Sequence, residues 1–401
     1  MRHDYSFTEE DAKNLPEPSE NPSLVAMFPE NLSAYLDLTR ALRDDAYVAA
    51  EDGDGRRMTA NLIAMFDLAE QVHEAPFIVD EMVATTIAGM ATSAIGRNLA
   101  ESAEAFRDED FSALTARLQR ILDEQAFRIR TNGDEAYYAD SIQRYYTDDG
   151  GGDGVFTIDG DWSDEDEQSD DDDDEEDEWL GDRWDRFRVP IWAALVMPGR
   201  SELAAANERY HRELDRVFRL PPWERDAALA DFVDEVPLWM ALRKWDSKSV
   251  QPEGYVYILK RVDAEVYQYV GGVLSAIAAV RHQRINHQWP TSLEDVVPKF
   301  LREVPIDQFT GRPLHYKLID GKPVVYSVSA DLDDDGGQSP ELDDRGSVRG
   351  YDDDSPADGD WILWPPIESG DADEDADGRI DRDRDDKVQA DNSVQDVPGG
   401  E

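Results

Sequence analysis

Residues 304–337 read VPIDQFTGRPLHYKLIDGKPVVYSVSADLDDDGG, in which turn-forming residues separate short apolar runs. The runs at 314–318 and 324–328 predict two β-strands. Asp320 and Gly321 lie between them and form a strong turn signal, although the four-residue gap 319–322 leaves the turn type open. The segment therefore predicts an antiparallel hairpin that runs directly into an acidic loop.

A long helix is expected ahead of this hairpin. Apolar residues recur at spacings of three and four over about six turns, which gives one apolar helix face. They are Leu259, Val262, Val266, Val270, Val273, Ile277 and Val280. This face is most simply a core face, and the alternative is a pilin-like spine helix that packs against copies of itself.

Three further elements follow the long helix. Pro290 ends the helical pattern, and Thr291 or Ser292 caps a short second helix that ends near Pro298. Residues 359–365 predict a last strand.

The order of these features resembles the C-terminal globular part of the major pseudopilins of type II secretion. The shared features are the long helix, Trp-Pro-Thr at 289–291, Pro-x-Asp-x-Phe-x-Gly-x-Pro at 305–313, Tyr-Ser-Val at 326–328, an Asp-rich loop at 331–337 and Asp-Trp at 360–361. The resemblance covers roughly 260–365, about a quarter of the 401 residues. It implies a helix packed on a small antiparallel sheet, with a late acidic loop that holds a calcium ion. The chain departs from the family at Gln308, where Pro is usual, and in having no apolar N-terminal membrane helix.

The acidic loop is the candidate metal site. Asp331, Asp333 and Asp335 match the first half of an EF-hand loop, in which alternate carboxylates face one cation. The twelfth position would be Leu342, which cannot act as a ligand, so the loop is not an EF-hand. The pseudopilin resemblance instead implies a closing ligand from Asp360. A set of oxygen ligands is typical of calcium, and the alternative is a solvated acidic loop without a metal.

The chain before residue 251 is predicted to be helical. Apolar stripes predict helices around residues 32–49, 58–72, 77–99, 111–122, 134–146, 203–218 and 223–233. The first two, separated by Asp52-Gly53-Asp54-Gly55, look like a tetratricopeptide-type hairpin, without a further recurrence of that repeat. The predicted fold class is α+β, an all-helical N-terminal domain followed by a helix and a small antiparallel sheet with an acidic metal loop.

The predicted domain organisation follows from these patterns and from composition. It is a flexible lead-in at 1–28, a helical domain at 29–147, a disordered acidic insert at 148–182, a helical continuation at 183–250, the pseudopilin-like domain at 251–366 and a disordered acidic tail at 367–401. Residues 164–178 contain thirteen acids and no base, so they cannot pack as a core. We therefore expect that residues 155–180 can be deleted with little loss of stability.

Composition limits the classes of function. The net charge of −51 argues against nucleic acid or an anionic membrane surface as a partner. The absence of cysteine removes disulfides, thiolate zinc sites and cysteine nucleophiles. No apolar run is long enough to span a bilayer, and residues 1–23 show no signal peptide. The expected location is the cytoplasm, or an extracytoplasmic or periplasmic space if a leader precedes the chain.

The favoured interpretation is a non-enzymatic structural or interaction protein that binds a protein partner and has a link to type II secretion through the resemblance. The alternative is a di-iron or other metal-dependent oxidoreductase in the helical domain. It rests on two Glu-x-x-His motifs, Glu70/His73 and Glu208/His211, because such motifs on two helices of a bundle can hold metal.

Overall fold

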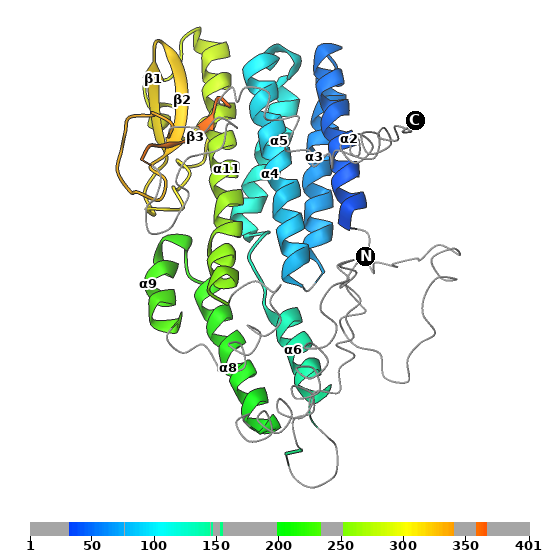
Figure 1. Cartoon of the computed structure of the whole chain (residues 1–401). Coiled ribbons are helices and arrows are strands. Elements are labelled where there is room, and N and C mark those ends of the chain that lie inside the picture. The colour runs from blue at the N-terminus through cyan, green and yellow to red at the C-terminus, as the bar shows by residue number, and fades with distance from the viewer. Residues whose placement is uncertain are drawn as a thin grey trace, which may run out of the picture. The chain divides into compact units, whose positions relative to one another are not determined.

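A computed structural model describes residues 32–75, 77–144, 146, 153–154, 199–233, 252–340 and 358–366. The predicted lead-in and acidic tail, nearly all of the acidic insert and part of the predicted helical continuation at 183–250 lie outside these residues. The chain divides into two compact units, residues 1–277 and 278–401, which are described separately (Figure 1).

Unit 1 is helical. Its helices are α2 (Leu32–Glu51), α3 (Gly55–His73), α4 (Ile78–Glu101), α5 (Asp108–Glu124), α6 (Asn132–Arg144), α8 (Arg200–Phe218), α9 (Pro222–Val233) and the first part of α11 (Pro252–Asn286). Helix α2 packs on α3 and α4, α3 packs on α5, and α6 packs on α8 (Figure 1). Each helix contains one of the predicted apolar stripes, so the helical prediction for these residues is confirmed.

The turn between α2 and α3 depends on its glycines and its aspartate. Gly53 has a φ of +70°, which side chains with a Cβ rarely adopt. The carboxylate of Asp54 accepts the backbone N–H of Arg57 and caps the N-terminus of α3. A Cβ on Gly55 would lie 2.1 Å from the carbonyl oxygen of Ala105, so only glycine lets the start of α3 approach that backbone.

Helix α4 is the most apolar helix of the unit. Within the described residues it alone is long and apolar enough to cross a membrane, and 61% of its apolar window is buried in the structure. Ile87 and Ile95 are fully buried, and so are Phe66 and Met65 of α3, which packs against it. This burial is the pattern of a helix at the centre of a folded core.

The helices after the acidic insert complete the same unit. Side chains of α6, α8 and α9 form one apolar cluster that includes Tyr138, Leu214, Phe218 and Leu229. Asn207 of α8 donates to the carbonyl of Glu135 in α6 at 3.0 Å. Residues 199–233 therefore belong to the same helical unit.

Helix α11 belongs to unit 1 as far as Ile277, whereas the sequence places a domain boundary at 250/251. Side chains near its start explain the difference. Asp263 pairs with Arg225 of α9, and the hydroxyl of Tyr267 accepts the backbone N–H of Phe127. The apolar stripe is buried at Val266, Val270, Val273, Ile277 and Val280.

Unit 2 contains the end of α11, a short 3-10 helix η4 (Leu293–Val296), and strands β1 (His315–Ile319), β2 (Lys322–Ser327) and β3 (Trp361–Trp364). The strands form an antiparallel sheet in the order β1-β2-β3 (Figure 1). Asp320 and Gly321 have φ angles of 50° and 78°, so both central residues of the hairpin turn have the positive φ of a type I′ turn. The α+β fold class is confirmed.

Candidate metal centre

Four aspartates meet at the acidic loop of unit 2. Asp331, Asp333, Asp335 and Asp358 each offer a carboxylate oxygen, and these atoms all lie within 4.8 Å of one another. Asp331 and Asp335 are partly buried, and Asp333 and Asp358 are exposed. The first three precede residues 341–357 and Asp358 follows them, so the cluster joins the loop after β2 to the chain entering β3.

The structure brings together three of the four predicted ligands, with Asp358 in the fourth place and Asp360 outside the group. Asp360 is fully buried, and its Oδ2 accepts the backbone N–H of Gly337 at 2.6 Å. Its own N–H donates to the carbonyl of Gln338 at 2.7 Å. Burial raises the pKa of Asp360, and the charges of Asp334 and Asp335 raise it further. Asp360 therefore holds β3 against the loop.

The carboxylates of the cluster are electrostatically strained. Desolvation raises the pKa of Asp335, and the carboxylates of Asp333, Asp358 and Asp331 raise it further. Oδ1 of Asp331 and Oδ2 of Asp335 are shielded from solvent and have no hydrogen-bond donor among the described residues. Carboxylate oxygens removed from water without a donor or a positive charge are unfavourable. A cation at this point would supply the missing charge, so the residues present fit a metal ion.

Asp334 lies between two of the clustered aspartates in sequence but contacts the sheet. Its Oδ1 accepts the hydroxyl of Tyr326 at 3.0 Å and the N–H of Gly336 at 2.9 Å. Its Oδ2 lies 3.3 Å from Nδ1 of His315. Burial raises the pKa of Asp334, but the hydrogen bonds from Gly336 and Tyr326 outweigh it and hold the pKa below its usual value. Asp334 is thus an ionised anchor that fixes the loop to β1 and β2.

The loop at 305–314 supports the start of the acidic segment. Asp307 is fully buried, and its two oxygens accept the N–H groups of Phe309 at 2.8 Å and Val328 at 3.2 Å. At the end of the acidic loop, the carbonyl of Gly336 accepts a hydrogen bond from Lys317 of β1 at 3.1 Å. The Pro-x-Asp-x-Phe motif therefore positions the backbone from which the aspartates project.

The chemistry of this donor set suits a hard divalent cation. Calcium takes six to eight oxygen ligands in flexible geometry, and carboxylates, backbone carbonyls and water can all contribute. The sequence could not separate Asp358 from Asp360, because both flank Gly359, whose φ of +126° sets the direction of the chain between them. The useful signal was the Asp-Gly-Asp pattern itself, which offers two candidate carboxylates.

The two Glu-x-x-His pairs are engaged elsewhere in unit 1. Glu70 accepts from Arg117 at 2.7 Å and from Arg120 at 3.2 Å. Glu208 is 63% exposed and pairs with Arg212, whereas His211 is buried with Nδ1 on the carbonyl of Asn207. Neither pair belongs to the cluster of aspartates found within the described residues.

Comparison with family models, with curated proteins and with solved structures finds no match to this chain.

Proposed function

We propose that the acidic loop of unit 2 binds one calcium ion through Asp331, Asp333, Asp335 and Asp358. On this proposal the chain is a non-enzymatic structural or interaction protein with a pseudopilin-like C-terminal unit, linked to type II secretion. The observation that supports it most is the set of four carboxylate oxygens within 4.8 Å of one another, drawn from both sides of residues 341–357.

The role of the ion is structural. Without a cation, the four carboxylates repel one another and push the loop away from the chain that enters β3. A bound calcium ion offsets this repulsion and links the two chain segments. Magnesium substitutes poorly, because it demands a compact octahedron and releases its water reluctantly.

The helical unit supplies the surface for a protein partner. Helices α2 and α3 form a hairpin through a tight Gly53 turn, a form that resembles repeat modules used for binding. Val79 and Met82 lie three residues apart on α4 and are 40% and 39% exposed, which offers an apolar contact on an otherwise acidic protein.

Calcium titration of the full chain tests the metal proposal directly. Because the chain carries a net charge of −51, weak calcium binding elsewhere is expected, and matched variants are needed to isolate the loop. Calorimetry should find one tight site in the wild-type protein that Asp335→Asn weakens at least tenfold. Asp320→Asn in the hairpin turn is the control and should leave this site unchanged. An equal affinity in wild type and Asp335→Asn would refute the site.

A further inference from the structure

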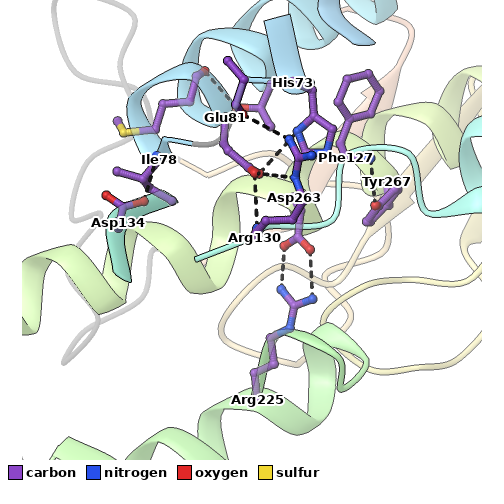
Figure 2. Close-up of polar contacts among 12 residues, drawn as sticks. His73, Ile78, Glu81, Phe127, Arg130, Asp134, Arg225, Asp263 and Tyr267 are labelled. Atoms are coloured by element: carbon purple, nitrogen blue, oxygen red, sulfur yellow. Dashed lines mark hydrogen bonds and ion pairs between the residues drawn. The ribbon is translucent and has the colours of Figure 1, made fainter. Parts of the chain in front are cut away.

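Glu81 is a buried carboxyl in the first turn of α4, with a side chain that is fully shielded from solvent (Figure 2). Its Oε1 accepts the backbone N–H of Arg130 at 3.2 Å and the Nε–H of Arg130 at 3.1 Å. Its Oε2 lies 3.3 Å from Nδ1 of His73. The two facing atoms do not form a well-aligned hydrogen bond, and both are shielded from water. The contact therefore joins α3 and α4 through two titratable groups with no solvent between them.

Of the two nearby arginines, only Arg130 contacts Glu81, because Arg225 is bound to another carboxylate. Arg225 of α9 directs both terminal nitrogens at Asp263 of α11, at 2.5 and 2.9 Å (Figure 2). Arg130 divides its guanidinium between Glu81 and the carbonyl of Ala75. Asp80, beside Glu81 on α4, is also almost fully buried. Glu81 thus shares one partly exposed guanidinium in a region that contains further carboxylates.

Every element around Glu81 contributes a charged or titratable group. They are His73 from α3, Asp80 from α4, Arg128 and Arg130 from the segment after α5, Asp134 from α6, Arg225 from α9, and Asp263 and Tyr267 from α11. Asp134 accepts the backbone N–H of Ile78 at the start of α4. Burial raises the pKa of Tyr267 far above its usual value, so this phenol stays neutral.

The directions of the two central pKa values agree with this geometry. Burial raises the pKa of Glu81 to about 8, although Arg130 opposes the shift. Burial, helped by the charge of Arg130, lowers the pKa of His73 to about 4. The imidazole is therefore neutral near pH 7, and the carboxyl retains a proton.

We infer that Glu81 holds one buried proton that latches the α3–α4 junction to residues 127–131, and that this junction loosens when the proton leaves in mildly alkaline solution. The segment 127–131 is held by contacts of the same region. Phe127 packs its ring 5.7 Å from that of His73 and donates its N–H to Tyr267, and Arg130 bonds to Glu81 (Figure 2). Ionised Glu81 would place an extra negative charge inside this desolvated junction.

The expected pH dependence follows from proton linkage. Because the pKa of Glu81 rises from 4.5 to about 8 on folding, its stabilising effect is complete below pH 4.5 and disappears by pH 8. Because the pKa of His73 falls from 6.5 to about 4, its effect is complete above pH 6.5 and is lost on acidification. The two effects offset each other below pH 6.5. Between pH 6.5 and 8, the opening equilibrium should rise tenfold per pH unit, or about 30-fold in all.

Hydrogen exchange of the full chain tests the inference. Peptides covering residues 127–131, corrected for the intrinsic exchange rate, should show this 30-fold increase in opening in the wild-type protein. Glu81→Gln cannot titrate and should abolish the increase, whereas His73→Gln should extend the rise down to about pH 4.5. Glu70→Gln, on the partly exposed Arg117 contact, is the control and should keep the wild-type profile. A flat wild-type profile, or a rise that persists in Glu81→Gln, would overturn the proposal.

A second measurement covers the case in which Glu81→Gln does not fold. Wild-type protein labelled with ¹³C at the glutamate side-chain carboxyl should show one resonance with a titration midpoint near pH 8. Midpoints below pH 6 for every glutamate would exclude a retained proton and contradict the latch.

Discussion

Tyr326 and Asp334 illustrate how single side chains position the acidic loop. The hydroxyl of Tyr326 donates to Asp334 at 3.0 Å, and Asp334 also accepts from Gly336, the residue that follows the proposed ligand Asp335. Tyr326→Phe removes one hydrogen bond to a charged group, worth about 1.5 kcal/mol or more, while it keeps the ring that packs near His315. We expect calcium affinity to fall about tenfold with little change in the apo fold.

The control for this prediction is Tyr316→Phe, because the hydroxyl of Tyr316 donates to Pro290, away from the acidic loop. Calorimetric titration of both variants with calcium tests this prediction. If Tyr326→Phe binds calcium as tightly as Tyr316→Phe, Asp334 does not position the ligands.

Arg225 shows what a buried ion pair demands of its partners. Its side chain is 3% exposed and that of Asp263 is fully buried. Removal of one member of such a pair leaves an uncompensated charge and typically costs 3–5 kcal/mol. Arg225→Met should therefore lower the free energy of unfolding by about that amount in urea denaturation. Arg219→Met, which breaks a largely exposed pair with Asp215, should change it by less than about 1 kcal/mol. Similar values for the two variants would contradict the role of Asp263.

At the scale of elements, the helices follow from hydrophobic periodicity, which depends only on local sequence. The unit to which the first part of α11 belongs cannot be predicted in this way. That part contacts residues far away in the chain, through Asp263 and Tyr267. The clustering of Asp331, Asp333 and Asp335 likewise follows from their spacing in the sequence, whereas a bound metal stays a prediction. The place of Asp358 in the cluster depends on the path of the chain at Gly359. The burial of Glu81 depends on packing, since an acid in the first turn of a helix is usually solvated.

The acidic insert provides a prediction about elements. Asp153 accepts the backbone N–H of Ser201 at 3.1 Å and its hydroxyl at 2.7 Å, so the chain on the two sides of residues 155–198 meets at the start of α8. Shortening a surface loop with adjacent ends changes its closure entropy only slightly. Deletion of residues 155–180 should therefore shift the melting midpoint of the protein by no more than a few degrees. A larger drop would show that the insert contributes to the folded core.

At the scale of the whole molecule, the chain combines a helical unit with a smaller unit that contains the acidic loop. The overall charge of −51 makes the exposed carboxylates of the protein sensitive to cations in general. General screening by salt acts on all exposed carboxylates alike, whereas on the calcium proposal the loop responds to one ion that fits its oxygens. Comparisons at equal ionic strength therefore separate the specific site from screening.

Thermal melting of the full chain in calcium, magnesium or chelator at equal ionic strength tests the calcium proposal most directly. Calcium at 100 times its dissociation constant should add about 2.7 kcal/mol to the stability of the unit that binds it. Asp358→Asn should abolish this gain and leave apo stability nearly unchanged. Asp360→Asn should instead lower apo stability, because its carboxylate accepts the N–H of Gly337. Asp375→Ala in the tail should have no effect. Equal melting in calcium, magnesium and chelator would contradict the calcium site.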